Sequence, residues 1–318
     1  MLDTRVTTRR RRLPSRLVPL ALSLVAWLAV GVAGPQQAQA QTQTGDPRHH
    51  HRYLGTWNYD QPVRESMRNI AVVSCPDGGN CRPGPPFHIP QIGTIVFSEA
   101  AGGGIVGRTD QGCTWTFGVR SASLELDPPS QRCFNQVIGS AYTLTKWSVT
   151  VSGNREREAI EGVSHQPTGD YTFRLDKGGR TRVTGNAWAQ AREVFPGTWR
   201  YDASDPQSRV NLLTTRYTDP DGQVRVVQAP QQGPITFRTG RGRTMTARTE
   251  NGCDWTLVAR GNTAELEPAG QTCRTARGTT RLTFWAVASD GRHQASIMAG
   301  VDESGGSFLL SIGSLTKR

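Results

Sequence analysis

Residues 108–117 read RTDQGCTWTF, and residues 248–257 read RTENGCDWTL. The similarity extends over residues 108–133 and 248–273, where 12 of the 26 aligned positions are identical. The two segments are offset by 140 residues. A repeat of that period is a whole domain, because the units of solenoid proteins recur roughly every 20–50 residues. The chain therefore contains two copies of one folding unit.

The repeat also predicts how the chain is divided. GTWNYD at residues 55–60 returns as GTWRYD at residues 197–202, which marks the start of each copy. Insertions between the copies fall where loops are expected, so the strands are kept and the connections vary. The predicted parts are a signal peptide at 1–40, a flexible polar tail at 41–53, a first repeat at 54–183, a linker at 184–195 and a second repeat at 196–318.

The first forty residues have the pattern of an export signal. An arginine-rich segment is followed by the apolar run LVPLALSLVAWLAVGVAG and by the small residues AQA at 38–40. These three parts are typical of a cleaved secretory signal peptide. The alternative is an uncleaved anchor, because the apolar run reaches the lower length limit for a spanning helix. The sequence leaves open whether export is of the general or the twin-arginine type. We expect a secreted or periplasmic protein without stable membrane insertion after cleavage.

Charge argues against nucleic acid as a partner. Removing the signal segment, with its six arginines and one aspartate, lowers the formal net charge from +11 to +6. The remaining basic residues are scattered and form no run. Nucleic-acid-binding proteins usually show a clustered basic patch or stripe, whereas scattered charges are typical of a solvated face.

The six cysteines predict three disulfides. Cys113 and Cys133 are separated by the same distance along the chain as Cys253 and Cys273, at matching places in the two copies. If each copy closes its own bridge, the pairs are Cys113–Cys133 and Cys253–Cys273, and Cys75–Cys81 remains. An even cysteine count behind an export signal is typical of disulfides. A zinc site is the competing interpretation, but no pair of cysteines or cysteine–histidine cluster has ligand spacing. We therefore expect no metal site and no cofactor.

The pattern inside each copy has a period of two. Cys113, Trp115 and Phe117 fall on one face of an expected strand, and the threonines between them fall on the other. Such alternation is typical of half-buried antiparallel strands, and turn signals such as DPDG and DKGG separate the strands. The predicted fold class is all-β: two tandem homologous antiparallel β-barrel domains, or β-sandwich domains, each with an internal disulfide.

The motif GTW at the head of each copy resembles the glycine–any–tryptophan motif of the calycin barrels, which include the lipocalins. In lipocalins this tryptophan closes one end of the barrel and packs against a basic residue from the last strand. The resemblance implies that Trp57 packs against Arg182, and Trp199 against Lys317. The chain also has the look of tandem secreted bacterial β-proteins of unassigned function.

Paired aromatic residues are the candidate ligand-binding residues. They recur in both copies, and aromatic side chains line ligand cavities and stack on sugars. They also supply much of the apolar area of a core, and their strand phase favours that core role. The candidates are Trp57, Tyr59, Trp115, Trp199, Tyr201 and Trp255.

These observations favour a secreted, non-catalytic, lipocalin-like protein that holds a small hydrophobic ligand. The alternative is an extracellular protein-interaction module, such as a protease inhibitor or an envelope-associated protein. For that role the candidate loop is CPDGGNCRPGPPFH at residues 75–88, which the second copy lacks. A hydrolase of unknown type is a third hypothesis. It ranks below the other two because no nucleophile-elbow, zinc-protease or phosphate-loop motif is present. We therefore expect no enzyme activity and no catalytic residues, and the oligomeric state is left open.

Overall fold

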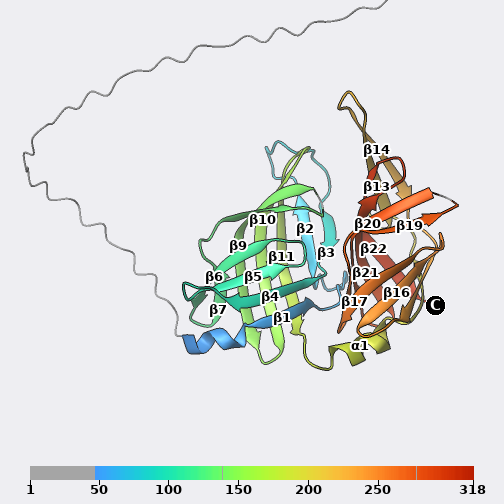
Figure 1. Ribbon diagram of the computed structural model, residues 1–318. Helices are drawn as coiled ribbons and strands as arrows, with labels where there is room; N and C mark the ends of the chain where they lie inside the picture. Colours follow the sequence, from blue (N-terminus) through green and yellow to red (C-terminus); the bar gives the residue numbers. More distant parts are fainter. Residues whose placement is uncertain (1–46, 138, 277) are drawn as a thin grey trace, which may run out of the picture. The chain divides into compact units, whose positions relative to one another are not determined.

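The computed structural model describes residues 47–318, apart from residues 138 and 277 (Figure 1). The predicted signal peptide at 1–40 lies outside the described residues. Within them, no helix is long and apolar enough to cross a membrane. The described chain is built almost entirely of antiparallel strands, so the all-β prediction is confirmed.

The first repeat forms a closed barrel of eight antiparallel strands. Each ring strand pairs with the next along the chain, and the last pairs with the first, since Trp57 lies opposite Arg182 and Tyr59 opposite Arg180. This closing pair decides for a barrel over a sandwich. The ring strands are β1 (Gly55–Tyr59), β4 (Thr94–Glu99), β5 (Ile105–Thr109), β6 (Thr114–Arg120), β7 (Ser123–Leu126), β9 (Ser140–Ser152), β10 (Arg155–Gln166) and β11 (Gly169–Arg182).

The second repeat forms the same closed barrel, and its closing pair sets Trp199 opposite Lys317. Its ring strands are β12 (Gly197–Tyr201), β15 (Pro234–Thr239), β16 (Thr244–Thr249), β17 (Asp254–Arg260), β18 (Thr263–Leu266), β20 (Gly278–Ser289), β21 (His293–Val301) and β22 (Ser307–Lys317).

Three short strands accompany each ring. In barrel one a hairpin of two of them extends the sheet from β11, and the third pairs with β9; barrel two repeats this arrangement on β22 and β20. They are β2 (Ile70–Ser74), β3 (Phe87–Pro90) and β8 (Gln131–Asn135) in barrel one, and β13 (Leu212–Thr218), β14 (Val224–Pro230) and β19 (Gln271–Thr275) in barrel two.

The long strands of both barrels bend at the same glycine. The pairing of β10 with β9 shifts register between Glu161 and Gly162. The equivalent pairing in barrel two shifts register at Gly300 of β21, which matches Gly162. A β-carbon on Gly162 would lie 2.5 Å from the carbonyl oxygen of Thr143 and 2.6 Å from the ring of Phe173. Only glycine allows this close approach, which lets the strand curl around the core.

All three predicted disulfides are present. Cys113–Cys133 and Cys253–Cys273 each span 20 residues, and Cys75–Cys81 spans 6. In each barrel the bridge that spans 20 residues ties the start of one ring strand to the short strand that pairs with β9 or β20. These bridges are typical of proteins that fold outside the cytoplasm.

Two segments outside the rings differ from simple coil. In the expected flexible tail, Pro47–Arg52 forms the 3-10 turn η1, and His50 is buried. Tyr53, directly after this turn, packs into the core of barrel one. In the linker, Ala187–Val194 forms helix α1, whose Ala191 belongs to the core of barrel two.

Barrel two carries an apolar outer face that barrel one lacks. Ile92, in the connection between β3 and β4, packs with Ala286, Ala288, Ala295 and Ile297 of β20 and β21. The register of barrel one puts polar or small residues at the equivalent four positions: Ser148, Thr150, Arg157 and Ala159. Because both faces of β20 and β21 are buried, the segment FWAVAS at 284–289 is apolar almost throughout rather than alternating.

Candidate functional site

The six aromatic residues predicted as ligand contacts lie in the cores. Their exposed fraction is 5% or less for five of them, and Tyr201 is partly buried against the core of barrel two. In barrel one, Trp115 packs against Tyr142 and Trp147 with ring centroids 5.4 and 6.1 Å apart. The structure thus places these side chains in the apolar cores, as their strand phase favoured, and their contact with a ligand stays a prediction.

The lipocalin-like end closure is present in both barrels. The guanidinium carbon of Arg182 lies 4.2 Å from the centre of the Trp57 ring, and the Nζ of Lys317 lies 5.2 Å from that of Trp199. Each indole N–H donates to a backbone carbonyl just upstream, that of Tyr53 at 2.7 Å in barrel one. The pairing that the resemblance implied is confirmed, and it rigidifies the end of each barrel.

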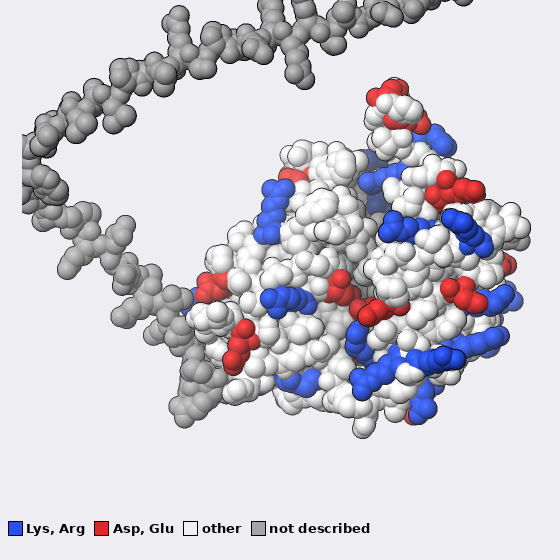
Figure 2. Space-filling view, in the orientation of Figure 1, with Lys and Arg blue, Asp and Glu red and all other residues white. Residues whose placement is uncertain are grey.

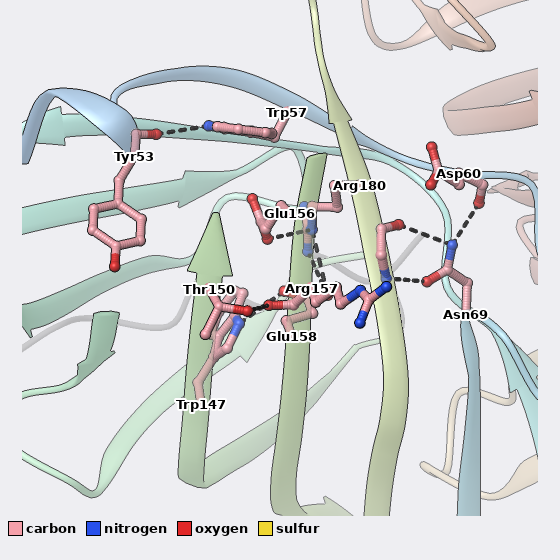
Figure 3. A network of polar contacts seen from close by, with 11 residues as sticks. Tyr53, Trp57, Asp60, Asn69, Trp147, Thr150, Glu156, Arg157, Glu158 and Arg180 are labelled. Atoms are coloured by element: carbon pink, nitrogen blue, oxygen red, sulfur yellow. Dashed lines mark hydrogen bonds and ion pairs between the residues drawn. The ribbon is translucent and has the colours of Figure 1, made fainter. Parts of the chain in front are cut away.

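A buried ionic cluster lies inside barrel one, next to this closed end (Figure 3). It consists of Tyr59, Trp147, Glu156, Glu158 and Arg180. The Arg180 guanidinium lies 3.3 Å from Glu158 and 3.5 Å from Glu156, and its carbon is 3.6 Å from the centre of the Tyr59 ring. The Trp147 indole donates a hydrogen bond of 2.8 Å to the other carboxylate oxygen of Glu158.

The cluster holds two carboxyl groups and one guanidinium, away from water. Glu156 is 2% exposed, and neither of its oxygens has a hydrogen-bond partner. Burial raises the pKa of Glu156 well above its ordinary value, and the nearby charge of Arg180 offsets only part of that rise. Burial likewise raises the pKa of Tyr59. Burial therefore favours the protonated form of Glu156, although both Glu156 and Glu158 lie within ion-pair distance of Arg180.

Barrel two has no such cluster, although it shares the surrounding frame. The strand register places Gln294, Ser296 and Leu315 where barrel one has Glu156, Glu158 and Arg180. The Trp285 indole donates to the Ser296 hydroxyl at 2.9 Å, as Trp147 donates to Glu158. The fold therefore does not need the charges. The sequence pattern did not reveal this cluster, although Glu156 and Glu158 stand in phase with the apolar Ile160.

The same three strands carry a polar layer on their outer face. The inward residues Tyr59, Arg180 and Glu156 lie side by side across β1, β11 and β10. Their neighbours along these strands lie side by side on the outer face: Asn58, Thr181 and Arg155. This outer layer forms the floor of a groove of about 470 Å³, which helix α1 and two loops of barrel two complete. The lining residues include Asn58, Asp60, Gln61, Arg68, Arg155, Thr181, Gln190, Asn262 and Asp290.

Hydrogen bonds hold the carboxylate of Asp60 in place within this groove. The Thr181 hydroxyl donates to it at 2.6 Å, and the Arg155 guanidinium lies 3.2 Å away. The backbone carbonyl of Asp60 accepts a 2.7 Å bond from the Asn69 amide, which also bonds both backbone groups of Gly179 (Figure 3). Asn211 makes the equivalent bonds in barrel two. In each barrel this asparagine supplies the hydrogen bonds that strand pairing would make where the chain leaves the first strand, and no sequence motif marks it.

Two acceptor atoms of the groove lack donors. The Asn58 side chain donates to the carbonyl of Arg260, but its Oδ1 is buried without a hydrogen-bond partner. The Oε1 of Gln61 is also buried and unpartnered. Asn58 is 2% exposed. Such atoms cost free energy unless a donor reaches them, so the groove wall contains two oxygens whose hydrogen bonding the described residues leave incomplete.

Among the residues that the structure describes, no group of three or more histidine, cysteine, aspartate or glutamate side chains could hold a metal ion. The three histidines at 49–51 precede β1, and His50 is buried.

The described molecule is thus a tandem pair of closed, eight-stranded antiparallel barrels of lipocalin-like size, with a polar groove beside the first. No family model matches the chain, and no curated protein matches it by sequence. Among solved structures it is similar to a Bacteroides fragilis protein assigned provisionally as an outer membrane protein, with 9% identity and a TM-score of 0.25 over 85% of this chain and 99% of that one.

A protein of unknown function from the DUF3598 family of Nostoc punctiforme is similar to the same degree. Its identity is 9% and its TM-score 0.25, over 86% of this chain and 98% of that one. A likeness at these values carries no conclusion about family or function.

Proposed function

We propose that this is an extracytoplasmic, non-catalytic binding protein that holds a small polar ligand in the groove beside barrel one. The observation that carries the proposal is the Oδ1 atom of Asn58, buried in the groove wall without a donor. The volume of about 470 Å³ lies in the range of small-molecule sites. Three disulfides support a location outside the cytoplasm.

The atoms of the groove indicate the chemistry of the ligand. Asn58 and Gln61 each have a buried oxygen without a donor, and Arg68 and Gln190 add further polar side chains to the lining. A molecule with several hydroxyl or amine groups, such as a sugar, a polyol or an amino acid, satisfies such a wall. A hydrophobic ligand in the barrel interior is less well supported, because the aromatic residues that would line it pack on one another.

The proposal gives the groove no catalytic role. Its central carboxylate, Asp60, is neutralised by Arg155 and hydrogen-bonded by Thr181. None of the lining residues is a histidine or a cysteine. These contacts suit a fixed binding wall better than a group that must release and take up protons.

The test is ligand-observed NMR with a panel of monosaccharides, polyols and amino acids. At least one probe should show saturation transfer from the wild-type protein. Its affinity should fall by about tenfold in Gln61→Leu, because one hydrogen bond in a desolvated site is worth about 1–1.5 kcal/mol. Asn58→Ala should act in the same direction. Arg200→Ala is the matched control, since Arg200 occupies the position of Asn58 on the first strand of barrel two.

Two outcomes contradict the proposal. One is that no probe in the panel binds the wild-type protein. The other is that binding is unchanged in both groove variants.

One observation favours protein binding as a second function. Residues 76–80 are exposed and closed into a loop by Cys75–Cys81, and Asn80 anchors the loop by accepting a 2.9 Å bond from the backbone of Asp170. Barrel two has no counterpart of this bridge. If the loop inhibits a protease, the intact protein should slow cleavage by a panel of secreted proteases, and deletion of residues 76–80 should abolish the effect while leaving groove binding unchanged.

A further inference from the structure

Strand β14 is an exposed edge. It pairs with β13 alone, and all seven of its residues, Val224–Pro230, are exposed. Val224, Val226 and Val227 have exposed fractions of 58%, 52% and 40%, and they make up three of the five large hydrophobic residues that are exposed in the described chain. The hairpin of β13 and β14 projects from barrel two and ends in an acidic tip, as Figures 1 and 2 show. Natural proteins usually protect such edges with lysine, proline or a bulge.

The equivalent edge of barrel one is protected. The guanidinium of Arg209, from barrel two, lies 4.4 Å from the centre of the Phe87 ring on β3. Ile92, just after β3, packs into the apolar face of barrel two. The position equivalent to Ile92 in barrel two is Gln232, because Gln91 and Gln231 both donate to the carbonyl of the asparagine that starts their hairpin. The partner of β14 is therefore not another barrel docked in the same way.

The hydrogen-bond phase of the hairpin shows which backbone groups of β14 are free. Asp219 donates to Gln223, and Gln231 donates to Asn211, so the odd-numbered residues of β14 pair with β13. In an antiparallel ladder the bonded positions alternate. The N–H and C=O groups of Val224, Val226 and Gln228 consequently point away from β13 into solvent. Pro230 has no N–H and ends this row.

We infer that β14 pairs with β14 of a second copy of this chain, antiparallel and centred on Val226. In that register Val226 faces its own counterpart, and Val224 faces Gln228. All three free residues then exchange both of their backbone hydrogen bonds with the second copy. The outward row contains no proline before position 230, so no donor is missing.

Charge and shape support a second copy as the occupant. The one charged residue of β14, Arg225, lies opposite Val227 of the other copy, so no like charges face each other across the pair. Val226 faces its own counterpart directly, with Val224 of each copy diagonal to it on the same side of the new ladder, and cross-strand pairs of β-branched residues stabilise a sheet. A two-fold symmetric contact of this kind closes on itself and yields a dimer instead of a fibre.

Sedimentation velocity over a range of protein concentrations tests the inference. The wild-type chain should move from monomer to dimer as concentration rises. Val226→Lys places two ammonium groups face to face on the symmetry axis and should weaken dimerisation by at least about tenfold, which corresponds to about 1.4 kcal/mol. Val96→Lys is the matched control, because Val96 is an exposed valine on β4, which has partners on both sides, and this variant should dimerise as the wild type does.

Two further measurements keep the inference falsifiable. Val226→Pro removes an outward N–H and leaves the bonds to β13 in place, so it should abolish the dimer without lowering the melting temperature of the monomer. Hydrogen exchange should show the amides of Val224, Val226 and Gln228 protected only at high concentration. The inference is overturned by a chain that remains monomeric or by a dimer that survives both Val226 variants. If β14 instead binds a different protein, the purified chain will remain monomeric.

Discussion

Replacing Glu156 with glutamine should make the protein less sensitive to rising pH. In the folded protein burial holds the pKa of Glu156 well above the ordinary value of 4.5. The unfolded chain releases this proton near that ordinary value, while the folded chain keeps it to higher pH. The folded state therefore binds more protons, and its stability falls as pH rises from about 4.5 through the raised pKa. Glutamine has no proton to release, so this part of the pH dependence disappears.

The size of the effect follows from one proton. Over the window in which Glu156 stays protonated only in the folded state, the free energy of unfolding falls by about 1.4 kcal/mol per pH unit. Glu156→Gln should remove that slope. It should also be tolerated sterically, because Gln294 occupies the equivalent buried position in barrel two.

The reverse exchange is the matched control. Gln294→Glu places a carboxyl group in barrel two, where Leu315 stands in place of Arg180 and offers no positive charge. That variant should gain a slope of the same sign, and it should be destabilised more at pH 8 than at pH 5. The two substitutions therefore move the pH dependence in opposite directions at equivalent sites.

The measurement is urea unfolding, monitored by tryptophan fluorescence, at several pH values between about 5 and 8. Hydrogen exchange of β10 peptides assigns the change to barrel one. If Glu156→Gln keeps the wild-type slope, Glu156 is ionised in the folded protein, and the assignment of the proton within the buried ionic cluster is wrong.

Two further predictions concern the frame of the barrels. Replacing Cys113 and Cys133 with serine should lower the free energy of unfolding by about 3 kcal/mol, because the bridge closes a loop of some twenty residues in the unfolded chain; an unchanged melting temperature with and without reductant would contradict this. Asn69→Ala removes three hydrogen bonds to Asp60 and Gly179 and should destabilise barrel one by about 2–4 kcal/mol. Asn211→Ala should cost a similar amount in barrel two, and a loss confined to one barrel would show that the two asparagines are not equivalent.

The duplication, the strands and the disulfides could all be predicted from the sequence. Alternation with a period of two is a local property, and Trp115 and Phe117 show it without any partner strand. The repeat then resolved the cysteine pairing, because Cys113–Cys133 and Cys253–Cys273 occupy matching positions. The packing of Arg182 on Trp57 was implied by the resemblance of GTW to the lipocalin motif, and no local pattern predicted it.

The barrel, the buried ionic cluster and the groove were decided by the tertiary structure alone. Closure depends on the pairing of β1 with β11, whose residues Trp57 and Arg182 are far apart in the chain, and no local pattern encodes which strands meet. That pairing brings Arg180 to Glu156 on the inside and Asn58 to Thr181 on the outside. A strand pattern shows that two faces differ, but only the register with its neighbours fixes which charges are buried together and which polar atoms are left without a partner.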